Sequence, residues 1–313
     1  MSRQTAQTCR PFFIALLLGC AGASSAFAQL PSRGTLTANN ISFAYFTEGS
    51  GPTCLVVGYP LAVSRALSPR LKRNLRFVFL ESRLTTPEER VGDVSHVTMD
   101  TLVDDIEQGR QRLGLDHICV LGHSIAGVLA LEYARRYPQH VSHVVMHGTP
   151  PFWDKRAADA MAAYWKGEAS AERQKRLASS WARIAPDSLQ KLPSSSADIL
   201  TYTTNAAKYF HDPAYDPVWL LEGDYWNRQA GQRLLGPIMA SYDLGQGATI
   251  EPPVFLAIGR SDFIVPFHLW DDEQRKIPKL SYNLFARSGH YPMLEERERF
   301  DELLLQWLQR TSR

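Results

Sequence analysis

This sequence of 313 residues lacks the features that mark several other classes of protein. It contains no internal repeat and no low-complexity tract, which argues against a repeat or fibrous architecture. It has little excess charge of one sign, with 34 lysines and arginines against 32 aspartates and glutamates. Proteins that bind nucleic acid or an anionic membrane surface normally carry a basic excess, so neither is an expected partner. A His-Glu-x-x-His motif is also absent, and we expect no metal and no cofactor.

The longest apolar run is too short for a stable membrane span. Residues 12–23 are almost wholly apolar, whereas a helix needs roughly 20 such residues to cross a bilayer. The first ten residues hold two arginines and no acid, and Ala26-Phe27-Ala28 follows the apolar run as a small-x-small cleavage site. This three-part pattern predicts a signal peptide at residues 1–28 and an exported protein, periplasmic or secreted. Leu17-Leu-Gly-Cys20 also resembles a bacterial lipobox, so the alternative is a lipoprotein anchored through Cys20.

Cysteine is scarce, with four in the whole sequence and two beyond the expected signal peptide. These two, Cys54 and Cys119, both lie in apolar runs that look like central strands. An oxidising compartment would permit a disulfide between them. Bridging two central strands demands a restricted geometry, however, and free cysteine is often simply a core residue. We therefore favour two buried thiols over a disulfide.

Apolar strand-like runs alternate with helical patterns over most of the chain. Continuous apolar runs without polar alternation are typical of strands that are covered on both faces. The last helix has apolar residues at i, i+3, i+4, i+7 and i+8 spacing between Phe300 and Leu308. This alternation predicts an α/β fold with a mostly parallel sheet and helices on both faces. The expected strands are residues 41–46, 54–57, 77–80, 117–121, 141–146, 254–258 and 280–285, and further helices are expected at 64–74, 98–113 and 128–137.

The alternation of strand and helix stops after Pro150-Pro151 and resumes after Pro252-Pro253. The stretch between them is helix-like, rich in aromatic residues, and holds five of the seven tryptophans. We interpret it as an insertion. The expected organisation is a core of residues 29–151 and 252–313 with a helical cap of residues 152–251.

The stretch Leu121 to Gly127, with the sequence LGHSIAG, joins an expected strand to an expected helix. A sharp turn from strand to helix needs small residues, and it pushes the residue at its corner outward. Ser124 occupies that corner, so the stretch predicts a nucleophile elbow. A bare Gly-x-Ser occurs by chance about once or twice in a chain of this size, so the interpretation depends on finding partners for the serine.

A serine hydroxyl needs a base within hydrogen-bond reach, and that base needs a third group to fix its tautomer. In a parallel sheet such groups gather at the carboxyl ends of the strands. Asp262 directly follows the strand at 254–258, and His290 directly follows the strand at 280–285. The chain order Ser124, Asp262, His290 is the one expected for a fold with this elbow. We predict that these three residues form a catalytic triad.

Other assignments of these residues are open. Asp262 could instead cap the following helix, and Asp271 and Asp272 are nearby rivals for the third position. His123 flanks the serine but belongs to the backbone of the elbow. Of the nine histidines, His290 is the one in the downstream loop position.

Acyl transfer also requires two backbone N–H groups that bind the developing oxyanion. Ile125 follows the nucleophile and supplies the first group by its position. The second is expected from the loop Gly58-Tyr59-Pro60-Leu61, which follows the strand at 54–57. Pro60 has no N–H, so Tyr59 is the preferred donor and Leu61 the alternative.

Four motifs give the chain a resemblance to the α/β-hydrolase superfamily and, within it, to the prolyl aminopeptidase-like branch. The resemblance implies an eight-stranded sheet, a helical cap between the sixth and seventh strands, and a triad at Ser124, Asp262 and His290. The motifs are Gly122-His-Ser-Ile-Ala126, Tyr133-Ala-Arg-Arg-Tyr-Pro138, Gly259-Arg-Ser-Asp262 and Gly289-His-Tyr-Pro-Met-Leu-Glu295.

The chain departs from the family pattern at three places. Ala126 stands where the elbow usually has glycine, a small change that leaves the predicted chemistry intact. Gly58-Tyr-Pro-Leu61 replaces the His-Gly-Gly-Pro-Gly loop of the peptidases, which weakens the assignment of a peptidase substrate. Glu81-Ser-Arg83 replaces the common Asp-x-Arg, and we interpret it as structural.

The expected function is an exported serine hydrolase that cleaves an ester or amide of a small molecule or short peptide through an acyl-enzyme. A carboxylesterase and an aminopeptidase remain open, and a catalytically inactive binding protein with the same fold is the alternative. Glu222 and Trp226 in the cap are the candidate substrate-binding residues, with Asp224 as a second carboxylate that could bind a substrate amine. The alternative for the acids is a solvated helix end, because Asp and Glu are usually exposed.

Overall fold

The computed structural model describes residues 31–185 and 187–312. The predicted signal peptide and the alternative lipid anchor at Cys20 lie outside these residues. Within the described ranges, no helix is both long enough and apolar enough to cross a membrane.

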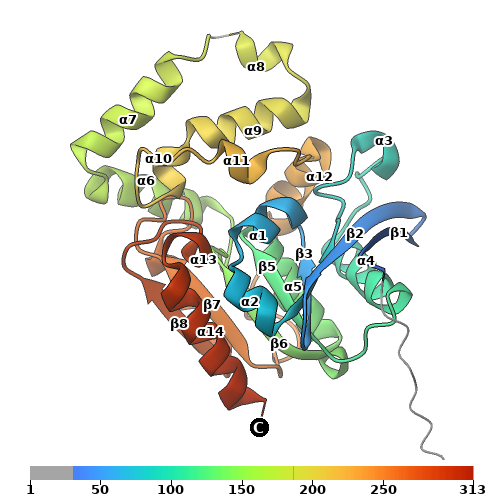
Figure 1. Ribbon diagram of the computed structural model, residues 1–313. Helices are drawn as coiled ribbons and strands as arrows, with labels where there is room; N and C mark the ends of the chain where they lie inside the picture. The colour runs from blue at the N-terminus through green and yellow to red at the C-terminus, as the bar shows by residue number, and fades with distance from the viewer. Residues whose placement is uncertain (1–30, 186, 313) are drawn as a thin grey trace, which may run out of the picture. The chain divides into compact units, whose positions relative to one another are not determined.

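One eight-stranded sheet organises the described residues, in the order β1-β2-β4-β3-β5-β6-β7-β8 (Figure 1). β2 runs antiparallel to both of its neighbours, and all other neighbouring strands are parallel. The prediction of a mostly parallel sheet with eight strands is therefore confirmed. The strands are β1 Arg33–Ala38, β2 Ile41–Gly49, β3 Thr53–Val57, β4 Arg76–Leu80, β5 Ile118–His123, β6 Val141–His147, β7 Val254–Gly259 and β8 Leu280–Phe285.

Helices cover both faces of the sheet. α1 (Pro60–Ala66), α2 (Pro69–Asn74) and α14 (Arg297–Thr311) share one apolar core with alternate residues of the central strands. α4 (Met99–Arg112) and α5 (Ile125–Arg136) pack together on the opposite side, where Gly109 lies so close to Leu80 that a Cβ would be 2.5 Å from its Cδ2. The short elements of the core are α3 Glu88–Val91, η1 Pro138–His140, η3 Phe267–Trp270, η4 Gln274–Lys276 and α13 Pro292–Glu295.

The segment 64–74, which we expect to be helical, is helical except at Leu67 and Ser68, where it divides into two helices. α1 ends at Ala66, and Ser68 has extended backbone geometry before α2 begins at Pro69. Proline disfavours helical geometry in the residue before it and has no N–H to continue a helix. The Ser68 hydroxyl then caps α2 by accepting the N–H of Leu71.

Among the described residues, eight helices joined by irregular segments lie between β6 and β7, in the range that we predict to form the cap (Figure 1). They lie beyond the carboxyl ends of the strands, above the elbow. The helices are α6 Lys155–Glu168, α7 Ala171–Ala182, α8 Ser188–Lys191, α9 Ser194–Thr204, α10 Ala206–Tyr209, α11 Val218–Leu221, α12 Arg228–Arg233 and the π-helix η2 Leu234–Ile238.

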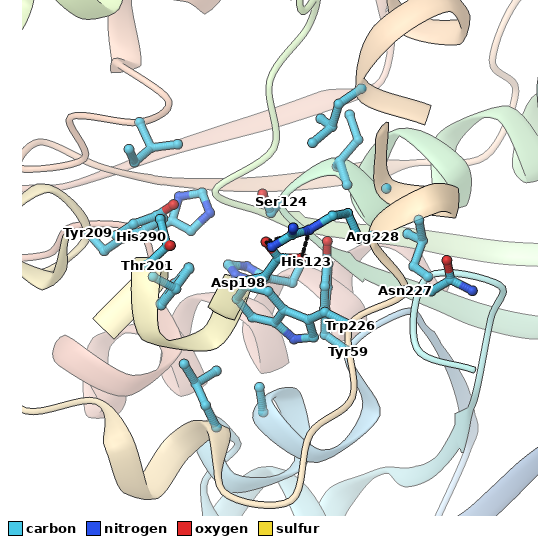
Figure 2. A pocket seen from close by; sticks show the side chains of 18 of the residues that line it. Tyr59, His123, Ser124, Asp198, Thr201, Tyr209, Trp226, Asn227, Arg228 and His290 are labelled. Atoms are coloured by element: carbon cyan, nitrogen blue, oxygen red, sulfur yellow. Dashed lines mark hydrogen bonds and ion pairs between the residues drawn. The ribbon is translucent and has the colours of Figure 1, made fainter. Parts of the chain in front are cut away.

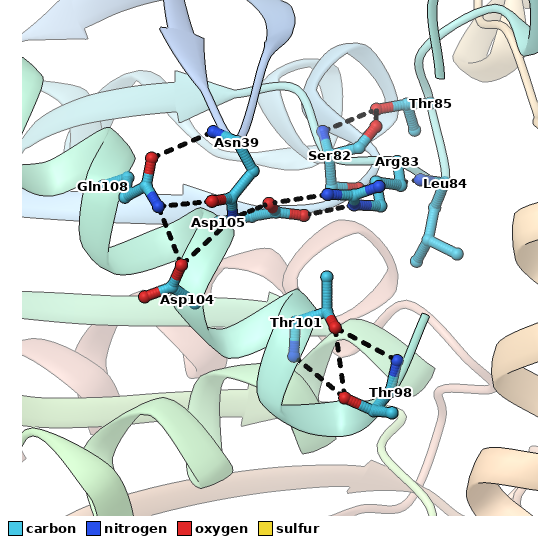
Figure 3. Close-up of polar contacts among 10 residues, drawn as sticks. All are labelled: Asn39, Ser82, Arg83, Leu84, Thr85, Thr98, Thr101, Asp104, Asp105 and Gln108. Carbon is cyan, nitrogen blue, oxygen red and sulfur yellow. Dashed lines mark hydrogen bonds and ion pairs between the residues drawn. The ribbon is translucent and has the colours of Figure 1, made fainter. Parts of the chain in front are cut away.

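A buried ion pair fixes the loop after β4 to helix α4 (Figure 3). Arg83 Nε lies 2.6 Å from Asp105 Oδ2, and Asn39 Nδ2 donates to Asp105 Oδ1 at 2.7 Å. α4 itself begins with a capping box in which the side chains of Thr98 and Thr101 bond to each other's backbone N–H. Arg83 thus has the structural role expected for the Glu81-Ser-Arg83 motif.

Cys54 and Cys119 are both buried and free, as favoured from the sequence. They lie side by side on the parallel strands β3 and β5, with their sulfur atoms 3.3 Å apart.

Candidate active site

Ser124 lies at the corner between β5 and α5 with φ 54° and ψ −131°, a conformation that L-residues rarely adopt. Its N–H donates to the carbonyl of His147 on β6, which holds the turn against the sheet. A Cβ on Gly122 would lie 2.3 Å from the carbonyl oxygen of Ala126, and a Cβ on Gly127 would lie 2.0 Å from Thr149 Oγ1. Glycine at positions 122 and 127 is therefore required by the space that the turn leaves.

The methyl group of Ala126 fits because the residue that faces it, Gly58, has no side chain. A Cβ on Gly58 would lie 2.7 Å from the Cβ of Ala126. Gly58 has φ 71°, which also favours glycine. The elbow and the loop after β3 thus pack directly against each other.

Asp262 and His290 follow β7 and β8 and meet behind the elbow. His290 Nδ1 lies 2.6 Å from Asp262 Oδ2, and the two residues are 1% and 0% exposed. The other carboxylate oxygen, Oδ1, accepts the N–H groups of Ile264 and Val265 at 2.9 and 2.8 Å. Asp262 therefore caps its own loop and orients the imidazole at the same time. The rivals Asp271 and Asp272 are exposed.

Ser124 and His290 both line a cavity of about 660 Å³ between the sheet edge and the cap. Figure 2 shows the serine hydroxyl and the imidazole on the same side of this cavity. Because Asp262 occupies Nδ1, the second ring nitrogen, Nε2, is the one left to act on a ligand.

Tyr59 and Ile125, the two predicted oxyanion donors, also line this cavity, whereas Leu61 does not. Tyr59 has φ 47° and ψ 50° and is the residue before helix α1, and Ile125 is the first residue of α5. The first N–H groups of a helix have no partner within the helix. In the part of the chain that the structure describes, neither N–H donates a hydrogen bond to the protein.

Two buried histidines lie beneath the elbow. His123 Nδ1 and His147 Nδ1 are 2.9 Å apart, and the His123 ring also contacts the His290 ring, with centroids 4.7 Å apart. Burial, followed by the proximity of His290, lowers the pKa of His147 to about 3, and burial and His147 lower the pKa of His123 well below its usual value. Both rings are therefore neutral at physiological pH. The sequence does not identify His147 as a functional residue, because its position in a strand does not show which side chains it contacts.

The cavity wall is mostly apolar, with several aromatic side chains and one charged pair (Figure 2). Six tyrosines and tryptophans line it: Tyr59, Trp153, Tyr202, Tyr209, Trp226 and Tyr291. Arg228 Nη2 lies 2.6 Å from Asp198 Oδ1, which joins α12 to α9. Sequence reasoning missed this pair, because its members lie on different cap helices.

The two cap candidates from the sequence have different surroundings. Trp226 lines the cavity, but Glu222 is exposed after α11 and is outside the lining. Asp224 is partly buried behind Tyr59, and burial raises its pKa to about 7. It lies close to Arg65 and to the backbone N–H of Ala62 in α1, both of which favour its charged form. Asp224 thus contacts the loop of the predicted oxyanion donor rather than the cavity itself.

No group of three or more His, Cys, Asp or Glu side chains among the described residues is arranged to hold a metal ion.

Comparisons with known proteins agree with this architecture. Residues 64–297 match the family model described as alpha/beta hydrolase fold. The chain is 31% identical over 278 residues to the AB hydrolase superfamily protein YclE of Bacillus subtilis, covering 88% of this chain and 98% of that protein. It is 25% identical over 237 residues to a proline iminopeptidase of Lactobacillus delbrueckii, covering 67% of this chain and 72% of that protein. Among solved structures, an alpha/beta fold family hydrolase from Bacillus anthracis superposes with a TM-score of 0.65 at 17% identity, covering 89% of this chain and 98% of the other.

Proposed function

The chain belongs to the α/β-hydrolase family, and we propose that it is a serine hydrolase that cleaves an ester or amide bond through an acyl-enzyme. The observation that carries the proposal is the 2.6 Å contact of buried Asp262 with His290, beside a strained Ser124 in the same cavity. A nucleophile, a base and a group that orients the base are the parts that this chemistry requires.

In the proposed reaction Ser124 Oγ attacks the carbonyl carbon of the substrate while His290 Nε2 takes the hydroxyl proton. Asp262 keeps the other proton on Nδ1 and stabilises the imidazolium that forms. The N–H groups of Ile125 and Tyr59 bind the oxyanion of the tetrahedral intermediate. His290 then protonates the leaving alcohol or amine. A water molecule, deprotonated by the same imidazole, releases the acyl group from the serine.

The shape and charge of the cavity favour a small, neutral substrate with an apolar or aromatic group. Its volume of about 660 Å³ and its aromatic lining suit such a group. An aminopeptidase needs a carboxylate for the substrate ammonium group, but Asp198 is the one acid among the lining residues and is already paired with Arg228. We therefore place esterase-like activity ahead of aminopeptidase activity. We also propose that the protein is exported, on the pattern of residues 1–28.

A fluorophosphonate probe tests the proposed nucleophile. We expect the wild-type protein to be labelled at Ser124 and the Ser124→Ala variant to remain unlabelled. Rates on short p-nitrophenyl esters and on prolyl arylamides then rank the two substrate classes. A folded wild-type protein that takes up no label would contradict the proposal and favour a binding protein with the same fold.

A further inference from the structure

One segment of the cap is hydrogen-bonded to the loops of both predicted catalytic partners. The segment, Ala207–His211, covers the end of α10 and the residues after it. The N–H of His290 donates to the carbonyl of Tyr209 at 2.6 Å, and the N–H of Phe263, next to Asp262, donates to the carbonyl of Lys208 at 3.0 Å. The loops of the base and of its orienting acid are thus both attached to this segment.

The carboxylate of Glu295 connects the same segment to both sides of His290. One oxygen, Oε1, accepts the N–H of Gly289 at 2.8 Å and that of Tyr291 at 3.4 Å. The other oxygen, Oε2, accepts the N–H of His211 at 2.6 Å. The approach is also close, because a Cβ on Gly289 would lie 2.1 Å from the carbonyl oxygen of Tyr209. The glycine therefore allows the cap segment to contact the backbone beside the base.

Arg173 on α7 holds the segment from the other side. Its buried guanidinium donates to the carbonyls of Ala207, Phe210 and His211, the second of these at 2.7 Å. It also lies over the Phe263 ring, 5.0 Å from the centroid. One side chain thus binds three carbonyls of the segment and contacts the loop of Asp262. Removing it would leave carbonyls of the segment without donors, which destabilises this conformation of the segment.

We propose that Arg173 is a positioning residue for catalysis, which acts through the segment Ala207–His211 to hold His290 and Asp262 in register with Ser124. This inference rests on the proposed function, since it concerns the geometry of the proposed triad. Arg173 contacts no reacting atom. Its effect follows from the dependence of the reaction on alignment, because a displacement of about 1 Å at the reacting groups can cost about 100-fold in rate. In this protein the cap is a support for the base as well as a wall of the cavity.

The test replaces Arg173 by Met and by Lys and compares both with Arg176→Met, a change of an exposed arginine on the same helix. With p-nitrophenyl butyrate as substrate, we expect Arg173→Met to lower kcat by about 10- to 100-fold and to leave KM within about twofold. Arg173→Lys should recover part of the loss, because an ammonium group can reach some but not all of the carbonyls. Arg176→Met should match the wild type. An unchanged kcat in folded Arg173→Met, or a raised KM with full kcat, would overturn the proposal.

Two further variants and a second readout keep the test decisive if Arg173→Met fails to fold. Glu295→Gln keeps an oxygen for Gly289 but presents an amide to the N–H of His211, and Gly289→Ala pushes against Tyr209. Each should lower kcat at constant KM, with Glu298→Gln, an exposed residue, as the control. Hydrogen–deuterium exchange should rise at residues 208–211 and 289–291 in the affected variants.

Hydrogen–deuterium exchange measures how firmly the segment Ala207–His211 is held, whether or not the protein is a hydrolase. If the wild type takes up no fluorophosphonate, the proposed function fails while exchange still measures the attachment. Equal exchange in Arg173→Met and Arg176→Met would overturn the inference by itself.

Discussion

Replacing Ser124 by glycine should make the protein more stable while removing its activity. Ser124 has φ 54° and ψ −131°, a backbone region that costs a residue with a Cβ about 1–3 kcal/mol. Glycine removes that strain, but its greater backbone freedom stabilises the unfolded state by about 0.5–1 kcal/mol. The balance is a gain of about 1 kcal/mol in the free energy of unfolding. For a domain of this size the gain corresponds to a rise of about 2 °C in Tm.

Ser124→Ala is the matched control, because alanine keeps the Cβ and therefore keeps the strain. Among the described residues the Ser124 hydroxyl makes no hydrogen bond to the protein, so its removal costs no internal bond. We expect Ser124→Ala to have the Tm of the wild type and Ser124→Gly to exceed both. Both variants should lose at least about 10⁴-fold in kcat, as triads do when the nucleophile is removed.

Calorimetry and urea unfolding of the three proteins in one buffer measure the difference, and fluorophosphonate labelling confirms the loss of the nucleophile. A Ser124→Gly variant that is no more stable than Ser124→Ala would refute the argument, because the elbow would then hold no strain that a Cβ causes.

Three further changes probe the triad, a buried acid and the cavity. Asp262→Asn should lower kcat on p-nitrophenyl butyrate by about 10⁴-fold with little change in Tm, because it removes the acceptor that fixes the tautomer of His290. A loss in kcat of less than about tenfold would contradict that role. Burial raises the pKa of Asp224 to about 7, above its unfolded value of about 4, so the stability from its neutral form is lost as pH rises between these values. The Tm of the wild type should therefore fall from pH 5 to pH 8 relative to Asp224→Asn, and parallel profiles would disprove the assignment. Arg228→Met leaves the Asp198 carboxylate without its cation. The ratio of kcat/KM on prolyl arylamides to that on esters should therefore rise by about tenfold or more. An unchanged ratio would count against this charge pair as a determinant of specificity.

The sheet and the candidate triad could be predicted because their signals are local. Seven of the eight strands overlap an expected strand, whereas β1, with the sequence RGTLTA, has no apolar run. Ser124 directly follows β5, and Asp262 and His290 lie in the loops after β7 and β8. Parallel strands place their carboxyl ends at one edge, so residues far apart in the chain converge without any knowledge of side-chain packing. The elbow adds a backbone constraint, the small residues around Ser124, which can also be recognised in the sequence.

The contacts within the cap could not be predicted, because they depend on how short helices pack. Arg173 and Arg176 lie one turn apart on α7 and look equivalent in the sequence, yet Arg173 is buried and binds three backbone carbonyls, whereas Arg176 is exposed. Asp198 and Arg228 meet only because α9 and α12 lie together. Glu222 lies close to Tyr225 and Trp226 in the sequence, but that proximity says nothing about which side of the chain faces the cavity.

Two departures from the family pattern, noted separately in the sequence, are neighbours in space. Ala126 adds a methyl group to the elbow, and Gly58 begins the loop that replaces the glycine-rich peptidase loop. With a Cβ at position 58 the two carbons would be 2.7 Å apart, so the methyl is accommodated only because that position lacks a side chain. The next residue, Tyr59, then takes a left-handed backbone conformation at the start of α1. The alanine thus restricts position 58 to glycine, and the elbow and the loop of the predicted oxyanion donor form one packing unit whose parts cannot vary independently.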